Sequence, residues 1–272
     1  MRTLVVRLGA LGDAVLTLPA IAHLLGEGDD VTALGVPASW GFLSEASPLR
    51  IEDAEASRWR SLFSGETPAA ARGFDRAFVL LGSSGLAAVD ALRGAMRRAA
   101  HVPPVRPGEA GEHAALRLLH GVGGETIDAA AVRRLLPTAA ADRHDLLLHP
   151  GSGGGAKRWP ADRFAALARQ TRRPLVLLGP AEDDLAGSFA GLPVARNQPL
   201  RRIAALLAGA DAFVGNDSGI THLASYLCPT LALFGPTDPR VWAPVGPHAR
   251  VIEAPGGNLA DLSVDSIAAR LR

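Results

Sequence analysis

The chain has 272 residues, of which 48% are hydrophobic, 20% charged and 5% aromatic. This composition predicts a globular core and excludes a disordered chain and a disulfide-stabilised miniprotein. The 28 basic and 27 acidic residues leave a net charge of +1, which provides no overall field for holding nucleic acid. At about 150 residues per domain, the length fits two small domains or one large α/β domain.

The cysteine count and the apolar runs bear on the compartment. Cys228 is the single cysteine, so an internal disulfide is impossible and the chain suits a reducing cytosol. Arg7 and Asp13 interrupt the apolar start of the chain, which we interpret as a strand and not as a signal peptide. No apolar run approaches the ~20 residues that span a bilayer. We therefore expect a cytoplasmic protein for which peripheral membrane contact is still allowed.

Short apolar runs alternate with longer stretches of helical period, which is the pattern of βαβ units around a mostly parallel sheet. In the first half this alternation predicts strands at residues 3–8, 31–36 and 76–81. The helices expected there cover residues 13–25, 40–45, 86–98 and 113–120, with a loop at 9–12 and a Pro/Gly-rich connection at 102–111.

Residues 135–145 interrupt the alternation with a proline, an alanine run and polar residues, and we interpret them as a linker. The predicted domains are residues 1–138 and 145–272. In the second domain we expect strands at 146–149, 175–179, 212–214 and 230–234, and helices at 160–171, 200–208, 219–227 and 264–271. Ligands of open α/β sheets bind at strand ends, so two facing sheets would form a cleft between the domains.

The loop that follows the strand at 146–149 has the composition of a phosphate site. Residues 149–160 read His-Pro-Gly-Ser-Gly-Gly-Gly-Ala-Lys-Arg-Trp-Pro. Glycine backbone can approach a phosphate closely, Ser152 offers a hydroxyl, and Lys157, the sole lysine, supplies a mobile positive charge. A flexible surface loop before a helix is the alternative.

Two carboxylates at strand ends have two interpretations each. Glu182 follows the second strand of the second domain, where an acid can accept hydrogen bonds from ribose hydroxyls or can stabilise a helix N-terminus. Asp13 follows Gly12 in the first loop, where a carboxylate in the cleft can take a proton from an acceptor hydroxyl. Otherwise Asp13 is the helix N-cap, worth about 1 kcal/mol.

Residues 215–224, Gly-Asn-Asp-Ser-Gly-Ile-Thr-His-Leu-Ala, combine several polar groups at a strand exit. Asp217 and Ser218 can cap the next helix, while Gly219 at its start leaves N–H groups at which a diphosphate can bind. His222 comes one turn later, so its ring can point to the same place. A lone histidine is more often structural, but this combination favours a functional site.

These residues resemble glycosyltransferase family 9, the ADP-heptose:lipopolysaccharide heptosyltransferases. The resemblance covers most of the chain and depends on three blocks: Arg-Leu-Gly-Ala-Leu-Gly-Asp-Ala at 7–14 with Pro19; His-Pro-Gly-Ser at 149–152 with Lys-Arg-Trp-Pro at 157–160; and Asn-Asp-Ser-Gly at 216–219 with His222, followed by Leu-Phe-Gly-Pro-Thr-Asp-Pro at 233–239 and Trp-Ala-Pro at 242–244. At residues 80–84 the chain reads Leu-Leu-Gly-Ser-Ser, where the family often carries an Asp-Leu-Gln pattern.

The resemblance implies an α/β protein of the GT-B type, with two Rossmann-like domains facing each other across a cleft. It implies inverting transfer of a sugar, heptose in the family, from an ADP-sugar donor to a hydroxyl acceptor such as a lipopolysaccharide core, without a metal or a cofactor. Asp13 and Lys157 would be the catalytic residues, and Gly12 would share the acceptor-side loop. The donor would bind at Ser152, Gly153, Lys157, Glu182, Asp217, Ser218, Gly219 and His222. We expect a monomer with peripheral contact at the inner membrane.

Two other classes remain open from the residues alone. The spacing of Gly151, Gly153 and Ala156, with Glu182 after the next strand, loosely fits a nicotinamide-dependent oxidoreductase. The cationic side chain of Lys157 beside these glycines fits a terminal diphosphate better. The second alternative is a nucleotide-sugar-binding protein without turnover.

Overall fold

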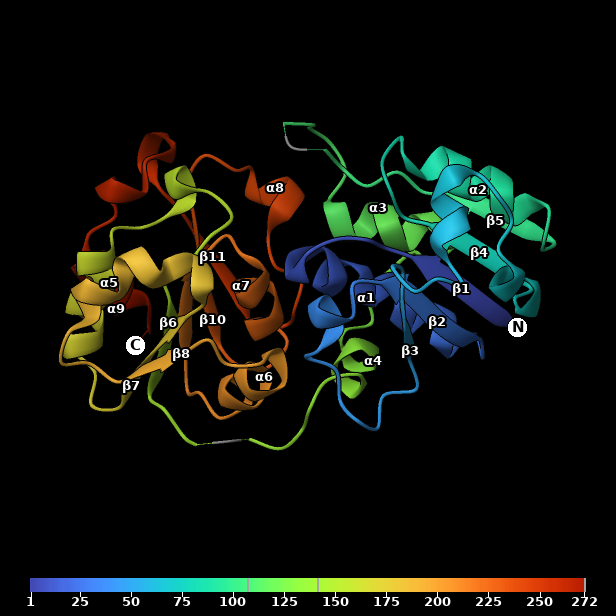
Figure 1. Ribbon diagram of the computed structural model, residues 1–272. Helices are drawn as coiled ribbons and strands as arrows, with labels where there is room; N and C mark the ends of the chain where they lie inside the picture. The colour runs from blue at the N-terminus through green and yellow to red at the C-terminus, as the bar shows by residue number, and fades with distance from the viewer. Residues whose placement is uncertain (107, 141, 272) are drawn as a thin grey trace. The chain divides into compact units, whose positions relative to one another are not determined.

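The computed structural model describes residues 1–106, 108–140 and 142–271. The chain forms two compact units, Met1–Leu136 and Pro137–Arg272, and each is built around one parallel sheet (Figure 1). Their border in the sequence falls within the residues predicted as a linker. Pro107 of the predicted Pro/Gly-rich connection, Ala141 of that linker and the C-terminal Arg272 lie outside the described residues.

The first unit contains a five-stranded sheet in the order β3-β2-β1-β4-β5. The strands are β1 (Arg2–Val6), β2 (Asp30–Gly35), β3 (Arg50–Asp53), β4 (Arg76–Val79) and β5 (Arg98–His101), and all neighbours are parallel. The chain winds from β1 to β2 and β3 on one side and then returns to β4 on the other. The strand order therefore reverses between β1 and β4, which is where open α/β sheets bind ligands.

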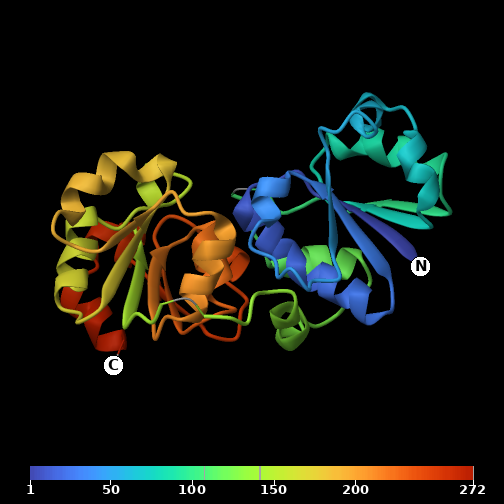
Figure 2. The same cartoon turned by 60° about the horizontal axis from the view of Figure 1, so that its bottom comes forward.

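Helices cover both faces of this sheet (Figure 2). They are α1 (Leu11–Gly26), α2 (Gly85–Arg93), α3 (Ala114–Gly121) and α4 (Ala129–Arg134), and α1 packs against both α3 and α4. Leu4 and Val6 of β1 point into one core with Trp59 and Leu92, whereas Val5 is buried on the opposite face. This alternation with period two is the reason why a run of apolar residues forms a strand covered on both faces.

Several predictions for the first unit are wrong. The strands predicted at 3–8 and 76–81 end at Val6 and Val79, so Arg7 and Leu80 begin the loops that follow. Residues 40–45 form no helix: a short 3₁₀ turn, Pro37–Trp40, is followed by turns. The helix predicted over 86–98 ends at Arg93 with Gly94 as its C-cap, and Arg98 already belongs to β5. Helix α1 begins at Leu11, two residues before the predicted start. The short elements β3 and α4 were not predicted, because β3 has only one apolar side chain in four residues.

The second unit contains a six-stranded sheet in the order β11-β10-β9-β6-β7-β8. The strands are β6 (Leu146–His149), β7 (Pro174–Leu178), β8 (Val194–Arg196), β9 (Phe213–Asn216), β10 (Thr230–Phe234) and β11 (Ala249–Glu253), again parallel. Strand β9 pairs with the opposite side of β6 from β7. The strand order therefore reverses between β6 and β9, and the loops that follow these two strands become neighbours.

The helices of the second unit are α5 (Ala161–Arg169), α6 (Leu200–Ala208), α7 (Gly219–Ala224), α8 (Pro239–Trp242) and α9 (Val264–Leu271). Trp159 and Phe164 pack edge to face, with ring centroids 4.8 Å apart, in a core that also holds Phe189 and Ile267. Helix α7 ends three residues before its predicted end. Strands β8 and β11 and helix α8 were not predicted.

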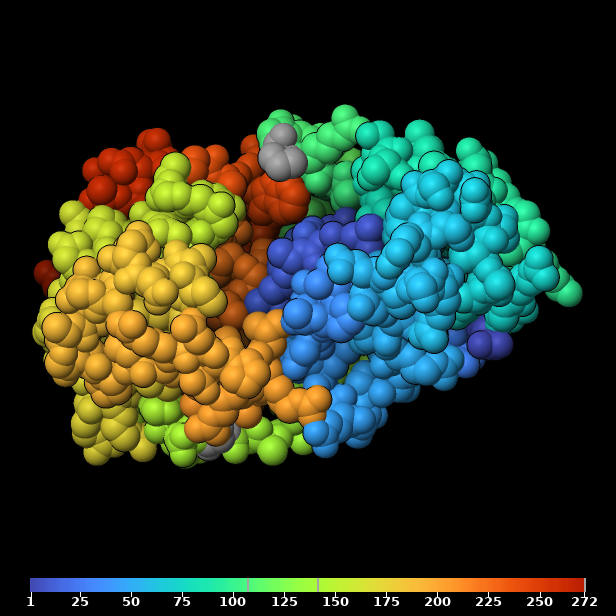
Figure 3. Space-filling model, viewed as in Figure 1, coloured from blue at the N-terminus to red at the C-terminus, as the bar shows by residue number. Residues whose placement is uncertain are grey.

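The surface of the first unit includes the segment from 55 to 73, light blue in Figure 3. It contains two 3₁₀ turns, Arg60–Ser64 and Ala69–Gly73. Among the described residues, no helix has the length and apolar character needed to span a membrane.

Candidate active site

The glycine-containing loop after β6 is held in place by a buried amide. Asn216, at the end of β9, is fully buried. Its Oδ1 accepts the backbone N–H of Trp159 at 2.9 Å, and its Nδ2 donates to the carbonyl of Pro150 at 2.8 Å. One side chain therefore fixes both ends of this loop. Asn216 is not among the predicted site residues, although a polar residue directly at the end of an apolar strand is a signal that could have identified it.

Lys157 and Asp217, 60 positions apart in the sequence, meet where the sheet reverses its order. Lys157 Nζ donates to Asp217 Oδ2 at 2.8 Å, and the Thr237 hydroxyl donates to the same oxygen at 3.0 Å. Ser152 Oγ donates to the backbone carbonyl of Asp217 at 3.1 Å. The Asp217 side chain is 9% exposed and that of Lys157 28%, so the ammonium lies at the border between the carboxylate and solvent. Thr237 was not among the predicted site residues.

Helix α7 places three more predicted residues beside this cluster. Ser218 is its N-cap, since its hydroxyl accepts the N–H of Thr221. Gly219 is the first helical residue, and the buried His222 has its Nε2 3.9 Å from Asp217 Oδ1. The structure thus brings Ser152, Lys157, Asp217, Ser218, Gly219 and His222 together.

The glycines of the loop after β6 differ in whether a side chain would fit at their position. A Cβ at Gly151 would lie 2.4 Å from Glu182 Oε1 and 2.6 Å from His149 Cε1, so only glycine fits there. A Cβ at Gly153 would meet nothing within 4 Å. The close approach that the sequence suggests for this loop is therefore required at Gly151, between two buried side chains, while Gly153 lies in open space.

Glu182 is buried and borders a pocket. Its Oε2 accepts the N–H of Gly179 at 2.8 Å, which stabilises a helix N-terminus, and the same side chain lines the pocket. His149 Nδ1 donates to the carbonyl of Leu177 at 3.1 Å. Burial lowers the pKa of His149, so its ring is neutral near pH 7.

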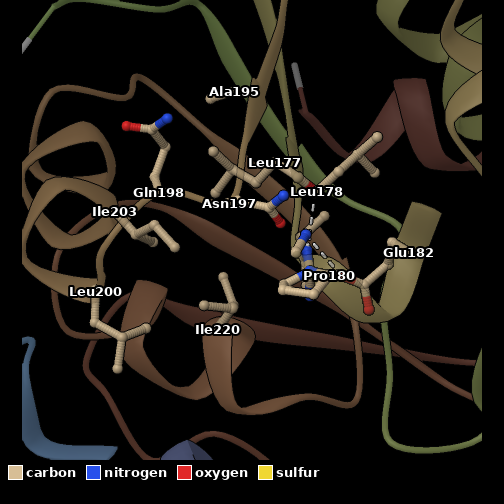
Figure 4. Close-up of a pocket in the computed structure, with 12 residues that line it drawn as sticks. Leu177, Leu178, Pro180, Glu182, Ala195, Asn197, Gln198, Leu200, Ile203 and Ile220 are labelled. Atoms are coloured by element: carbon tan, nitrogen blue, oxygen red, sulfur yellow. Dashed lines mark hydrogen bonds between the residues drawn. The ribbon is translucent and has the colours of Figure 1, made fainter. Parts of the chain in front are cut away.

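The pocket has a volume of about 350 Å³ and is mainly apolar (Figure 4). Its lining residues are His149, Leu177, Leu178, Gly179, Pro180, Glu182, Ala195, Asn197, Gln198, Leu200, Ile203 and Ile220. Leu200 and Ile203 come from α6 and Ile220 from α7, while Asn197 and Gln198 add amides. Asn197 has a φ of 49°, a left-handed conformation that asparagine tolerates, and was not predicted as a site residue.

Asp13 lies in the first unit, at the end of β1 where the strand order reverses. Because α1 begins at Leu11, Asp13 belongs to its first turn and is not the N-cap, which is Ala10. One carboxylate oxygen accepts the N–H of Ala10 at 3.1 Å and the other accepts a hydrogen bond from Arg7. The Asp13 side chain is 41% exposed, and Gly12 beside it is half-buried.

Each of the two units has a parallel sheet, and its polar site residues lie where the strand order reverses. This is the architecture of GT-B glycosyltransferases. The structure superimposes on Escherichia coli ADP-heptose lps heptosyltransferase II with a TM-score of 0.78 at 20% identity, covering 100% of this chain and 97% of that one. The match to E. coli heptosyltransferase WaaC with ADP has a TM-score of 0.71 at 21% identity, covering 100% and 99%. The predicted fold class is confirmed.

The chain belongs to glycosyltransferase family 9 (heptosyltransferase), whose family model matches residues 122–270. Lipopolysaccharide heptosyltransferase 2 of Escherichia coli (strain K12) is 38% identical over 114 residues, 36% of this chain and 33% of the relative. Lipopolysaccharide heptosyltransferase 1 of the same strain is 31% identical over 146 residues, 50% and 45%. The matched stretch thus spans a third to somewhat under half of these relatives. These matches give no support to the oxidoreductase alternative.

Proposed function

We propose that the protein is an inverting glycosyltransferase that transfers heptose from an ADP-sugar donor to a hydroxyl of a lipopolysaccharide core acceptor. The observation that carries this proposal is the cluster of Lys157, Asp217 and Ser152 at the reversal point of the second sheet. Family membership supports the reaction class, and the names of the relatives support heptose and the lipopolysaccharide acceptor.

The donor's nucleoside fits the pocket beside Glu182. A flat base is stabilised by apolar side chains, which Leu200, Ile203 and Ile220 supply, and the nearby amides and the Glu182 carboxylate can hydrogen-bond to base and ribose. Ile220 is also the second residue of α7, next to Gly219. A nucleoside in the pocket therefore directs its diphosphate toward the first turn of α7 and the Lys157–Asp217 pair.

The pairing of Lys157 with Asp217 holds its ammonium where it can also bind a phosphate. In the structure its ammonium is paired with Asp217, whose carboxylate also accepts the Thr237 hydroxyl. An ammonium has three donors, so Lys157 can keep Asp217 and still bind an oxygen of the diphosphate. The partial exposure of Lys157 leaves this approach open from the solvent side. Asp217 then acts as the group that orients Lys157, and the N–H groups of Gly219 and its neighbour add neutral donors. The single hydroxyl proton of Ser152 is donated to the Asp217 carbonyl, so Ser152 donates to the diphosphate only by turning away from that carbonyl.

The proposed chemical step is a direct displacement at the anomeric carbon. The acceptor oxygen attacks the anomeric carbon, the bond from that carbon to the β-phosphate oxygen breaks, and its electron pair stays on the departing ADP. Asp13 takes the acceptor proton, and Lys157 stabilises the charge that develops on the diphosphate. One direct displacement inverts the anomeric carbon. Because Asp13 and Lys157 belong to different units, the reaction requires the units to bring donor and acceptor together.

The proposal assigns the charge stabilisation to protein donors and includes no metal or organic cofactor. Within the described ranges, no three His, Cys, Asp or Glu side chains are grouped as metal ligands. A test is transfer activity in excess EDTA, which the proposal expects to be unchanged; a loss restored by one divalent cation would contradict it. We propose that the protein acts in the cytoplasm as a monomer, in peripheral contact with the inner membrane that carries the acceptor.

Ligand-dependent thermal stability tests the donor site. At a concentration 100 times Kd, a ligand adds about 2.7 kcal/mol to the free energy of unfolding. ADP and ADP-heptose should therefore raise Tm by several degrees, and NADH should not. Stabilisation by NADH alone would support the oxidoreductase alternative and contradict the proposal.

A further inference from the structure

The buried guanidinium of Arg7 connects the two loops at the reversal point of the first sheet. Arg7 is the first residue after β1, and its Nη1 donates to the carbonyl of Leu80, the first residue after β4, at 2.7 Å. Its Nη2 donates to Asp13 Oδ1. The side chain is only 8% exposed. One fork of donors thus joins the first turn of α1 to the loop after β4.

The burial of Arg7 costs free energy of folding, so stability alone does not explain it. Burial lowers the pKa of Arg7, and the neighbouring Asp13 opposes that shift, so the guanidinium remains charged. Its Nε is buried, and no hydrogen-bond partner for it lies among the residues that the structure describes. A buried charge with an unsatisfied N–H is expensive, and an apolar side chain of similar size could fill the space. A functional contribution of the guanidinium accounts for this cost.

Arg7 and the backbone hold Asp13 in one orientation. The second carboxylate oxygen accepts the N–H of Ala10 at 3.1 Å. At Gly9 a Cβ would lie 2.2 Å from Asp13 Cβ, so the carboxylate occupies the space that a side chain would need. Both oxygens are therefore fixed by a donor while the side chain stays 41% exposed. Each oxygen keeps a lone pair for a proton that arrives from the solvent side.

The loop after β4 is fixed independently. His101 Nε2, at the end of β5, lies 2.8 Å from the carbonyl of Leu81 and 3.0 Å from that of Gly82. Ser83 and Ser84 follow as exposed hydroxyls. Arg7 therefore connects Asp13 to a rigid loop that presents polar groups at the same end of the sheet.

We propose that Arg7 is a positioning residue for the transfer step, which sets the Asp13 carboxylate against the loop at residues 80–84 so that it meets the acceptor hydroxyl. This inference depends on the proposed role of Asp13 as the base. It assigns Arg7 no contact with the donor. Its effect should therefore appear in kcat, should depend on Asp13, and should leave ADP binding unchanged.

A double-mutant cycle tests this coupling. Transfer is measured as ADP release from ADP-heptose with a heptose-free lipopolysaccharide core as acceptor, for wild type, Arg7→Met, Asp13→Asn and the double variant. A misplaced reacting group can cost on the order of 10²-fold, so Arg7→Met should lower kcat roughly ten- to a hundredfold. In the Asp13→Asn background the same change should cost less than about twofold, because the group that Arg7 positions is already inactive.

Arg76→Met is the matched control. Arg76 forms a similar buried pair with Asp29, at 2.5 Å, but at the start of β4, the other end of the same sheet. Its loss should lower Tm and leave kcat within about twofold, as expected for a distant independent site. If Arg7→Met does not fold, Arg7→Lys in both backgrounds gives the same cycle, because lysine retains the charge and loses the two-pronged contact.

The outcomes separate the two proposals. Full activity of Arg7→Met, or an equal loss in both Asp13 backgrounds, overturns the positioning role and leaves the proposed function intact. A wild-type protein that binds ADP but transfers nothing from ADP-heptose overturns both. An effect of Arg7→Met on Kd for ADP comparable to its effect on kcat also contradicts the inference.

Discussion

Replacement of Lys157 by alanine separates recognition of the diphosphate from recognition of the nucleoside. Lys157 Nζ lies 2.8 Å from Asp217 Oδ2, and the variant removes this ammonium from an oxygen to which the Thr237 hydroxyl also donates. An ADP diphosphate would then meet a negative carboxylate in place of an ammonium. The loss should therefore fall on ligands that carry phosphates and spare those that do not.

The size of the effect follows from the burial of the pair. Two unit charges 4 Å apart interact by about 4 kcal/mol at an effective dielectric constant of 20, which is an upper bound for a side chain 28% exposed. A hydrogen bond to a charged group contributes about 1.5–3 kcal/mol. We therefore expect Kd for ADP to rise roughly 10- to 150-fold, by the tenfold change per 1.4 kcal/mol, and Kd for adenosine to change less than twofold.

Isothermal titration calorimetry with ADP and with adenosine measures both constants. Arg172→Ala is the matched control, because it removes one positive charge from the same unit at a side chain that is 82% exposed. It should leave both constants unchanged. An equal loss of ADP and adenosine affinity in Lys157→Ala, or an equal effect of Arg172→Ala, would refute a phosphate role for Lys157.

Three further predictions concern the loop after β6 and its surroundings. Gly151→Ala should lower the free energy of unfolding by about 1–3 kcal/mol in urea titrations and weaken adenosine binding, since the new Cβ overlaps Glu182. Gly153→Ala should have neither effect, because a Cβ there meets nothing within 4 Å. Equal effects of the two substitutions would contradict the close packing at Gly151. Asn216→Ala should cost about 2–4 kcal/mol, because two buried hydrogen bonds to the loop are lost, and an unchanged urea midpoint would contradict this. Burial lowers the pKa of His149, so below about pH 6.5 the unfolded chain binds a proton that the folded chain does not, and stability should fall as the pH drops. A His149→Gln variant should show a smaller loss between pH 7 and 5 in the same titrations; an identical loss would exclude His149 as the cause.

The elements with strong periodic patterns could be predicted from the sequence. Helices α6 and α9 and strands β6 and β10 have the predicted bounds, because their apolar spacing is clear and glycine, proline or polar residues flank them. Strands β3, β8 and β11 lie at sheet edges or carry charged residues, so their half-exposed patterns resemble loops.

The site could be predicted in its residue types more readily than in its contacts. Strand ends at a reversal of sheet order indicate that the loops with Lys157 and Asp217 lie close together. The direct pairing of these two side chains could not be predicted, because it depends on side-chain geometry between residues 60 positions apart. The same is true of Thr237, which donates to the same oxygen from 20 positions away. Asn216 was not predicted as a site residue because its position at a strand end does not show which backbone groups of the loop its amide would bind.

The most direct test of the proposed function compares wild type with Asp13→Asn in transfer from ADP-heptose to a heptose-free lipopolysaccharide core. The wild type should transfer heptose with inversion at the anomeric carbon. Since general base catalysis contributes about 10²- to 10⁴-fold, the variant should lose that factor in kcat while its Kd for ADP stays the same. A variant as active as the wild type, or a product with retained configuration, would contradict the account.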